Sequence, residues 1–341
     1  FECFYNANYY FRNPHRYKTE AEKINKLNIL KRNYFNNKKE HNRSGKVLYD
    51  FLEVSGNLLK ENVKIAVANI LVEKDNIAKS FKNTPNTSKA RRKEFLNILN
   101  DAERNKADFL ILPELSVPHR WFPLLADESR RKDRVLIAGL EHITINDICF
   151  NFTITLLPLN NGGIKDAVLV LRLKNHYSPH EEKTIKDQGK VVPKPTEATY
   201  NKFIWNKIHF SIYNCYELAN ITHRTIFRSE VDILFASEYN RDINYFSNIV
   251  DTVTRDIHCY FVQANSSDFG DSRITKPSRT EIKDILRLKG GTNNVILCGD
   301  IDLRSLREFQ STRVTGQKAV KFKNTPPDYD HSKAEKRLLG K

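Results

Sequence analysis

The sequence predicts an α/β layered domain over residues 61–310, because long buried strands alternate with helices in this region. Strand patterns occupy residues 63–70, 108–115, 133–142, 149–159, 166–176, 207–215, 231–237, 259–266 and 294–303. Helical patterns lie between several of these strands, at residues 89–107, 219–230 and 245–258. The turn "NNGG" joins the fourth and fifth strands, which predicts that these two strands form a hairpin.

The two flanks of this region carry most of the positive charge. The chain has a net charge of +15, of which residues 1–60 contribute +6 and residues 311–341 contribute +5. Residues 1–60 include a basic amphipathic helix pattern at 20–40 and no strand pattern, so we interpret them as a connector or the end of a preceding domain. Residues 311–341 contain a Pro-Pro pair and are expected to form an extended basic tail that packs on a neighbour or stays mobile.

Composition excludes several classes of protein. Hydrophobic residues make up 40% of the chain and aromatic residues 11%, which excludes wholesale disorder. No apolar run is long enough for a membrane span, and no signal peptide is recognisable. The five irregularly spaced cysteines predict neither a disulfide framework nor a metal site, so we expect a reduced cytoplasmic protein. The chain begins at Phe1 and contains no methionine, as expected for a portion of a longer polypeptide or for a sequence with methionines omitted.

Three reactive side chains directly follow buried strands. Glu114 comes after "DFLILP", Lys174 after "VLVLRL" and Cys215 after "HFSIYN". Catalytic groups of open α/β domains tend to lie beyond the carboxyl ends of strands. Taken singly, a buried cysteine is more often part of the core, and a charged residue at a strand end is usually solvated. Together, a carboxylate base, an ammonium and a thiol favour a pocket for nucleophilic catalysis.

Three segments resemble the signature segments of the nitrilase, or carbon–nitrogen hydrolase, superfamily in the same chain order: "ADFLILPELSVP", "LVLRLKNHYSPHEE" and "FSIYNCYEL". Supporting segments extend the resemblance over residues 61–310: "VKIAVANI", "NDICFNFTITLLPLNNGGI", "VDTVTRDIHCYFVQANSSDFG" and "CGDIDLRSLREF". The resemblance implies an α-β-β-α sandwich that forms a homodimer and requires no metal or cofactor. It also implies hydrolysis of a carbon–nitrogen bond in a small-molecule amide or nitrile.

The resemblance assigns a role to each residue of the predicted site. Cys215 would attack the substrate carbon and form a thioester or thioimidate. Glu114 would take the thiol proton, return it to the leaving amine and then activate the hydrolytic water. Lys174 and the backbone N–H of Tyr216 would hold the oxyanion.

Further acidic and polar residues are expected to position the substrate. The family often has a second glutamate seven or eight residues past the lysine; Glu181 and Glu182 lie at these offsets, and the sequence slightly favours Glu182. Glu238 and Asn265 fall in loops that line the family's pocket. Glu217 replaces the aspartate usual in small-amide hydrolases, and "CYE" resembles the branch that transfers acyl groups between lipids. That branch carries membrane helices, which this sequence lacks, so lipid acyl transfer is not expected.

Other interpretations remain open. His176 and His180 flank the lysine loop and allow a Cys–His hydrolase as an alternative, while Cys149, Cys259 and Cys298 lie in strand patterns typical of core. A second hypothesis is a nitrilase-fold scaffold or regulatory module of a nucleic-acid-handling assembly, active or not. The chain resembles the nitrilase-like domains that are fused to bacterial reverse transcriptases in antiphage defence. The basic flanks fit contact with nucleic acid, or they are solvated surface that only solubilises the protein.

Overall fold

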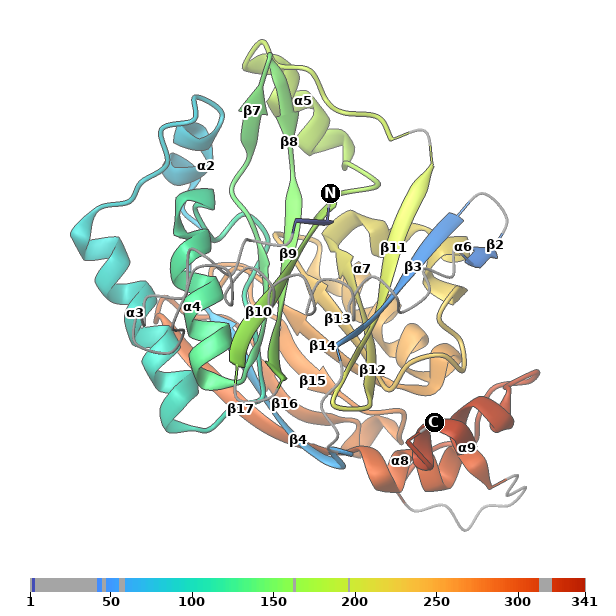
Figure 1. Ribbon diagram of the computed structural model, residues 1–341. Helices are drawn as coiled ribbons and strands as arrows, with labels where there is room; N and C mark the ends of the chain where they lie inside the picture. The colour runs from blue at the N-terminus through green and yellow to red at the C-terminus, as the bar shows by residue number, and fades with distance from the viewer. Residues whose placement is uncertain are drawn as a thin grey trace, which may run out of the picture.

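A computed structural model describes residues 2–3, 42–44, 47–54, 59–161, 164–195, 197–312 and 321–340 of the chain. Two β-sheets pack face to face, and helices cover the outer face of each sheet (Figure 1). The architecture is therefore an α-β-β-α sandwich, as predicted.

The first sheet, which we call sheet A, is built mainly from the first half of the chain. Its strand order is β1 (Glu2–Cys3), β10 (Ile164–Leu173), β9 (Phe152–Asn161), β6 (Val135–Gly139), β5 (Phe109–Ile111), β4 (Asn62–Asn69) and β17 (Val295–Asp302). The neighbouring strands β4, β5 and β6 are parallel. The predicted hairpin is confirmed, because β9 and β10 pair in antiparallel fashion. Parallel strands end at the same edge of a sheet, so the loops that follow β5 and β6 meet there.

The second sheet, sheet B, has the strand order β16 (Asp284–Leu288), β15 (Ser272–Thr275), β14 (Tyr260–Ala264), β13 (Ile233–Ser237), β12 (Ile208–Asn214), β11 (Ala198–Trp205), β3 (Val47–Val54) and β2 (Asn42–Ser44). Its central strands β12, β13 and β14 are parallel. A separate ribbon is formed by β7 (Ile143–Ile145) and β8 (Ile148–Phe150). The loops after β12 and β13 therefore share one edge of sheet B, as those after β5 and β6 do in sheet A.

The main core lies between the sheets, and strand alternation supplies it. Val63, Ile65 and Val67 of β4 belong to this inter-sheet core, whereas Ala66 and Ala68 of the same strand belong to the cluster packed against helices. Successive side chains of a strand point to opposite faces of the sheet, and both faces of this strand are buried. The strand therefore appears in the sequence as a continuous apolar run. Aromatic rings from both sheets meet in this core, and Phe109 of sheet A packs on Phe210, Phe235 and Trp205 of sheet B.

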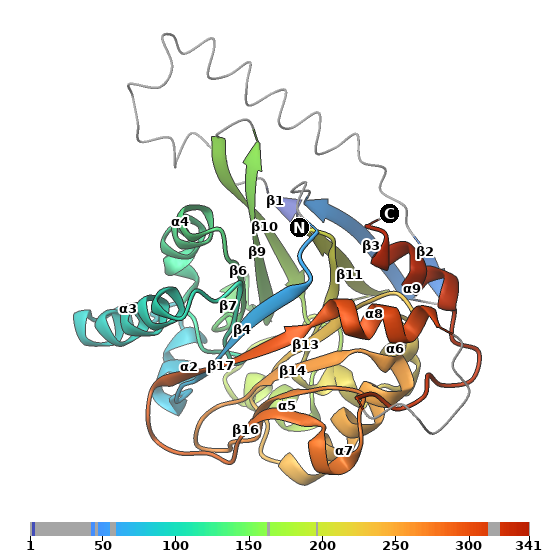
Figure 2. The ribbon, with the colours of Figure 1, turned by 90° about the horizontal axis from the view of Figure 1, so that it is seen from below.

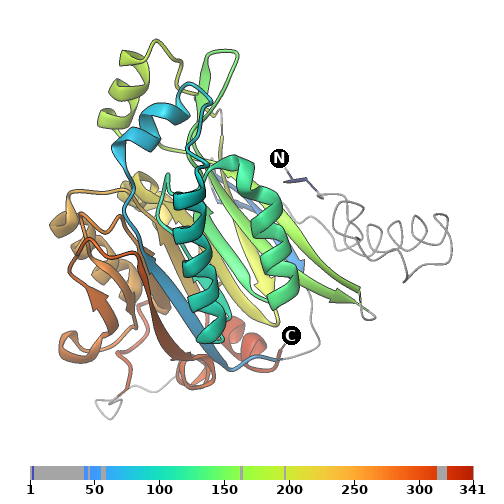
Figure 3. The same ribbon diagram turned by 90° about the vertical axis from the view of Figure 1, so that its left-hand side faces the viewer.

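Helices form the two outer layers. Figure 3 shows α3 (Lys89–Arg104) and α4 (Phe122–Lys132) side by side over sheet A. The predicted helix at 89–107 is confirmed: Ser88 caps its start, and its buried face repeats at helical spacing through Phe95, Ile98, Leu99 and Ala102. Over sheet B lie α6 (Ile221–Thr225) and α7 (Ile243–Val253). These are shorter than the helices predicted at 219–230 and 245–258: residues 226–230 form turns after α6, and a π turn, Thr254–His258, follows α7.

Both flanks contribute to the fold more than the sequence predicted. The expectation of no strand pattern within residues 1–60 is wrong, because β1, β2 and β3 lie there, and the eight residues of β3 pair in parallel with β11. The sequence reading missed it because a strand pairing with a segment far along the chain has no local partner. The basic helix predicted at 20–40 lies outside the described residues.

The C-terminal expectation also needs correction. Within residues 311–341, the described segment 321–340 is not extended, because it contains helix α9 (His331–Leu338). This helix packs on α8 (Leu303–Ser311) of the same chain, at the C-terminal end of the molecule (Figure 2). The boundaries proposed for the three regions, 1–60, 61–310 and 311–341, remain a prediction.

A buried ion cluster holds α9 in place. Asp232, fully buried at the start of β13, accepts hydrogen bonds from Arg307 of α8 at 2.6 Å and from Arg337 of α9 at 3.0 Å. The backbone N–H of His209 donates to the same carboxylate at 2.9 Å. Burial alone would raise the pKa of Asp232, but the two guanidinium groups outweigh it and hold the pKa below its ordinary value. The carboxylate therefore stays ionised and ties both helices to sheet B.

Replacing Arg337 by alanine should destabilise the fold by about 3–5 kcal/mol, because it leaves a buried carboxylate with one arginine fewer. Chemical denaturation monitored by circular dichroism measures this loss. Lys336→Ala, at the exposed neighbouring position, is the matched control and should change stability by less than about 0.5 kcal/mol. Equal effects of the two substitutions would contradict the structural role given to Arg337.

Candidate functional site

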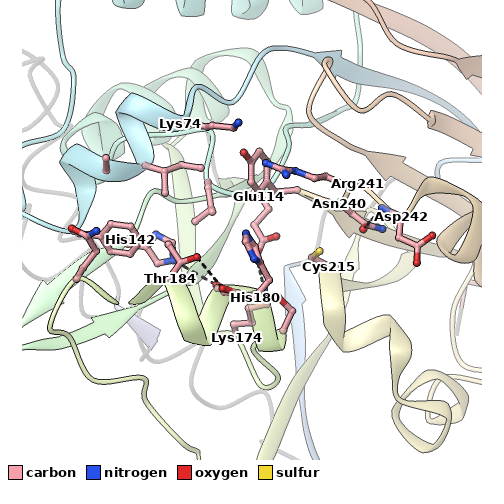
Figure 4. A pocket seen from close by; sticks show the side chains of 18 residues that line it. Lys74, Glu114, His142, Lys174, His180, Thr184, Cys215, Asn240, Arg241 and Asp242 are labelled. Carbon is pink, nitrogen blue, oxygen red and sulfur yellow. Dashed lines mark hydrogen bonds and ion pairs between the residues drawn. The ribbon is translucent and has the colours of Figure 1, made fainter. Parts of the chain in front are cut away.

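Glu114, Lys174 and Cys215 line one cavity of about 540 Å³ (Figure 4). Glu114 follows β5, Lys174 follows β10 and Cys215 follows β12, so strands of both sheets deliver their carboxyl ends to this cavity. The rest of the wall comes from α2 (Lys74–Ser80), α5 (Pro179–Asp187), His142 after β6, and the loop 239–242 after β13. The structure therefore brings together the three side chains that the sequence placed at strand ends.

Lys174 occupies the centre of the charged part of the site. Its ammonium group donates to Glu114 Oε1 at 2.6 Å and to Glu181 Oε2 at 2.6 Å. The side chain of Lys174 is only 1% exposed, so its charge is removed from water and must be neutralised within the protein. The two carboxylates more than outweigh burial and raise the pKa of Lys174 well above its ordinary value. Lys174 is therefore a permanent cation at neutral pH.

Asn151 links the two carboxylates from the far side. Its side-chain amide donates to Glu114 Oε1 at 2.8 Å and to Glu181 Oε1 at 2.7 Å. Its backbone N–H donates to the hydroxyl of Tyr177 at 2.9 Å, and Asn214 donates to its side-chain carbonyl at 3.2 Å. In the sequence this asparagine stood out only as part of the supporting segment "CFNF". Its role depends on Asn151 lying beside Glu114, which is 37 residues away in the chain.

The pKa values of Glu114 and Glu181 are shifted in opposite directions. Burial, with a further contribution from the charge of Glu181, raises the pKa of Glu114, although Lys174 and Asn151 oppose this. Burial would raise the pKa of Glu181 too, but Lys174 and His142 outweigh it and lower this pKa to about 2. Two neighbouring carboxylic acids whose pKa values are shifted apart can take different chemical roles. The pKa of Glu114 thus lies above its ordinary value, while Glu181 is a fixed negative charge at neutral pH.

Cys215 stands at a sharp turn. It has a left-handed backbone with φ of +43° and begins a 3-10 turn, Cys215–Ala219, directly after β12. A non-glycine residue in this conformation costs about 1–2 kcal/mol, which the surrounding hydrogen bonds must outweigh. Burial and the nearby charge of Glu114 raise the pKa of the thiol well above its ordinary value, opposed by Lys174 and the backbone N–H of Tyr239. The resting cysteine is thus a neutral thiol that needs a base to react.

Glu217 has a structural position that differs from the predicted contact with substrate. It is fully buried, and both its oxygens accept hydrogen bonds from Arg172, at 2.7 and 2.8 Å. The backbone N–H groups of Asn175 and Asn214 also donate to it, each at 2.7 Å. The carboxylate is saturated and lies outside the cavity wall. It ties the loop that carries Lys174 to the turn that carries Cys215.

The choice between the two glutamates on α5 also needs correction. Glu182, which the sequence slightly favoured, pairs with Lys186 at 3.1 Å on the outer face of the helix. Glu181 instead lies in the cavity and contacts Lys174. Successive residues of a helix are about 100° apart, so only one of the two can face the site. Ser178 caps this helix by accepting from the Glu181 N–H at 3.2 Å, which fixes its first turn.

The other three predicted contacts lie behind the cavity wall. Glu238 is fully buried, its backbone carbonyl accepts from the Glu114 N–H at 3.2 Å, and burial raises its pKa to about 8. Asn265 accepts from the Asn240 N–H at 2.9 Å and so holds the loop after β13. The Tyr216 ring packs against the outer core of sheet B. None of these three side chains belongs to the cavity wall, so they act on the site through its backbone and supports.

The histidines do not form a dyad with the cysteine. His176 contacts the ring of His223 at 3.0 Å, and His180 lies on α5 across the cavity from Cys215 (Figure 4). His142, which the sequence analysis did not single out, is buried in the wall with Nε2 3.5 Å from Glu181 and its ring stacked on Phe81. Only its position after β6, beside the other strand ends, marks it in the sequence.

Of the three cysteines predicted to lie in the core, Cys149 and Cys259 are buried, whereas Cys298 is only half-buried. Within the described part of the chain, no group of three or more histidine, cysteine, aspartate or glutamate side chains could hold a metal ion. The same residues contain no helix long and apolar enough to cross a membrane.

Comparison with solved structures identifies several with the same fold. Nit3 from Saccharomyces cerevisiae, a member of branch 10 of the nitrilase superfamily, is similar over 78% of this chain and 99% of its own, with 13% identity and a TM-score of 0.55. A CN-hydrolase superfamily protein from Xanthomonas campestris, with an arsenic adduct in its active site, is similar over 75% of this chain and 100% of its own, with 10% identity and a TM-score of 0.53.

An amidase from Nesterenkonia sp. AN1, in a mutant form with acrylamide added to its active-site cysteine, is similar over 72% of this chain and 96% of its own, with 12% identity and a TM-score of 0.50. No protein-family model matches the sequence, and no curated protein matches it. The structural neighbours are members of the nitrilase, or CN-hydrolase, superfamily, so the fold that the sequence segments implied is the observed one.

The lowered pKa of Glu181 makes the stability of the folded protein depend on pH. Its pKa in the folded protein, about 2, lies below the ordinary value of 4.5, so the stability that it contributes is present above pH 4.5 and is lost as the pH falls toward 2. Glu181→Gln should therefore lower stability at neutral pH by roughly 2–3 kcal/mol and flatten the loss between these pH values.

Urea denaturation at a series of pH values measures both effects. Glu182→Gln is the matched control, because its carboxylate lies outside the cavity. This substitution should leave the dependence of stability on pH as it is in the unmodified chain. If Glu182→Gln flattened the profile and Glu181→Gln did not, the assignment of the two glutamates would be reversed.

Gly139, the last residue of β6, lets the Glu114 loop approach the sheet. A Cβ at Gly139 would overlap Glu114 Cα and lie 2.8 Å from the backbone nitrogen of Leu115. Gly139→Ala should cost about 1–3 kcal/mol of stability and displace the Glu114 carboxylate. At Gly299, the nearest atoms are ends of side chains, such as Ile274 Cδ1 at 2.9 Å, so Gly299→Ala should cost less. Thermal denaturation compares the two; an equal loss would argue against tight packing at Gly139.

Proposed function

We propose that this chain is a carbon–nitrogen hydrolase of the amidase or nitrilase type that acts through a covalent cysteine intermediate. The observation that carries the proposal is the arrangement of Lys174 between Glu114 and Glu181, inside the cavity that also holds Cys215. A base, a fixed cation and a thiol around one cavity are the groups that acyl transfer from nitrogen requires.

In the first half of the reaction, the thiol of Cys215 attacks the carbonyl carbon of the bound amide, and Glu114 takes the thiol proton. The raised pKa of Cys215 means that this transfer accompanies the attack rather than precedes it. The negative charge that develops on the carbonyl oxygen is stabilised by Lys174 and the backbone N–H of Tyr216. The C–N bond then breaks, the leaving nitrogen takes the proton from Glu114, and a thioester remains on Cys215.

In the second half, water attacks the thioester carbon and gives a proton to Glu114. The C–S bond breaks, Cys215 regains a proton and the carboxylic acid leaves. The elevated pKa of Glu114 suits it to gain and lose a proton in both halves. Glu181, with a pKa of about 2, keeps Lys174 in position and cannot compete for that proton.

The predicted partners stand apart from this chemistry. A homodimer, as the resemblance implied, and a cytoplasmic location remain predictions. The scaffold hypothesis with nucleic-acid contact, linked to reverse transcriptases of antiphage defence, depends on the basic flanks. In the described part of the C-terminal flank, Lys321 pairs with Asp302, Lys333 with Glu230 and Arg337 with Asp232. Lys323 and Lys336 of the same segment are exposed and form no ion pair with the described residues, and we favour the enzyme on the arrangement of Glu114, Lys174 and Cys215 around one cavity.

Labelling with iodoacetamide followed by mass spectrometry tests the proposed nucleophile. Cys215 should be alkylated at least about tenfold faster than Cys149 and Cys259, because it opens to the cavity and has a base beside it. Glu114→Gln should slow this labelling roughly a hundredfold or more, since general-base assistance is lost.

The control for this experiment is Glu182→Gln, which removes a carboxylate outside the cavity and should label as the unmodified chain does. Equal and slow labelling of all cysteines, or labelling of Cys215 that does not depend on Glu114, would refute the proposed mechanism.

A further inference from the structure

The cavity is far larger than the group that reacts. Its volume of about 540 Å³ is in the range of pockets that enclose a whole small molecule, whereas an amide group alone has only three heavy atoms. Much of the substrate must therefore lie beyond the carbon that Cys215 attacks. The wall away from Cys215 should match the chemistry of that part.

One side of the wall presents nitrogen donors. Lys74 at the start of α2, and Asn240 and Arg241 in the loop after β13, all line the cavity; we call these three residues the mouth cluster. Figure 4 shows Lys74 and Arg241 on the upper side of the cavity, with Lys174 on the lower side. Both Lys74 and Arg241 are largely exposed, which places them at the open end of the cavity rather than at its base.

Within the described residues no carboxylate pairs with the mouth cluster, although Asp242 also lines the cavity. Among the described residues, neither Lys74 nor Arg241 forms an ion pair, and the side-chain nitrogen of Asn240 is buried without a hydrogen-bond partner. Asp242 is the carboxylate nearest in the chain, and it caps α7 by accepting from the Tyr245 N–H at 3.3 Å. Because that nitrogen has almost no accessible surface, the groups open to a bound acceptor are the exposed cations of Lys74 and Arg241.

The loop that bears two of these donors is held in shape before any ligand binds. The Arg241 guanidinium donates to the uncharged hydroxyl of Tyr239 and lies 5.3 Å from the centre of the Phe269 ring, which in turn packs on Tyr239 at 5.0 Å. Asn265 accepts from the Asn240 N–H at 2.9 Å and donates to its carbonyl at 2.8 Å. An arginine that is already oriented loses less entropy when it binds an anion.

The inner end of the cavity, around Lys174, disfavours an anionic group. Glu114 and Glu181 share the single charge of Lys174, so an anionic group beside them would meet two carboxylates. From Lys74, the chain of α2 continues through the cavity-lining side chains of Ile77 and Ala78 to Phe81, whose ring stacks on His142 beside Glu181. A substrate that fits this gradient has a neutral reacting end, an apolar middle and a negative far end.

We propose that the cavity takes an amide whose far end carries an anionic oxygen group, a carboxylate or a phosphate, bound by Lys74 and Arg241. The amide at the reacting end of this substrate rests on the proposed carbon–nitrogen hydrolase activity, whereas the anionic far end does not depend on it. The anionic end is recognised by charge-assisted hydrogen bonds from these two cations, and the apolar side chains of α2 set its separation from the amide.

Matched substrates test the proposal. Aliphatic primary amides of equal chain length, ending in methyl, carboxylate, phosphonate or ammonium, are compared by their rate of ammonia release. The anionic members should exceed the methyl-ended amide in kcat/KM by roughly tenfold to a hundredfold, the scale of one or two charged hydrogen bonds. Added salt should reduce this preference. The ratio between the carboxylate and phosphonate arms identifies which anion the site takes.

Variants assign the preference to the mouth cluster. Lys74→Gln and Arg241→Gln should each reduce the anionic-to-methyl ratio by roughly tenfold, whereas Lys79→Gln, on the same helix and outside the cavity, should preserve it. A preference for the ammonium-ended amide, no preference, or a preference that persists in both cavity variants overturns the proposal.

A binding experiment separates this inference from the proposed function. Calorimetric titration of the Cys215→Ala variant with the same amides measures affinity without catalysis. Tighter binding of the anionic members, lost in Lys74→Gln, supports the mouth cluster even if no amide is hydrolysed, and in that case only the hydrolase proposal fails. Hydrolysis without any difference in affinity or rate between the members overturns the anion site and leaves the hydrolase standing.

Discussion

The buried ammonium of Lys174 is the constraint on which the rest of the site depends. Removing such a charge from water costs several kcal/mol, which only close and well-oriented partners can offset. Glu114 from the loop after β5 and Glu181 from α5 supply those partners, and Asn151 at the start of β9 aligns both carboxylates. Segments of the chain that are far apart must therefore converge on one point, and the two sheets must end at the same edge.

Buried ion pairs also join distant segments of the chain at other places in the fold. Arg172 and Glu217 join the strand before Lys174 to the turn at Cys215, and Asp232 joins two C-terminal helices to sheet B through a pair of arginines. A buried ion pair adds little net stability over an apolar contact, but losing one partner is costly. These pairs thus make alternative arrangements of the segments unfavourable, which suits a site that needs fixed distances.

Lys174 affects the pKa values of its two carboxylate partners differently. The lysine lowers the pKa of one glutamate to about 2, while burial keeps the pKa of the other above its ordinary value. Two chemically identical side chains therefore become a permanent anion and an exchangeable base. Cys215, with its left-handed backbone, lines the same cavity as Glu114 and the mouth cluster.

The sequence by itself determined the layered α/β class, most central strands and the three residues Glu114, Lys174 and Cys215. These features are local, because strand periodicity and the residue that follows a strand are written in adjacent positions. Only the tertiary structure decided that Glu181 rather than Glu182 faces the lysine, that Glu217 is a structural partner of Arg172, and that residues 47–54 complete sheet B. Each of these depends on the turn of a helix or on a partner distant in the chain, which no local pattern records.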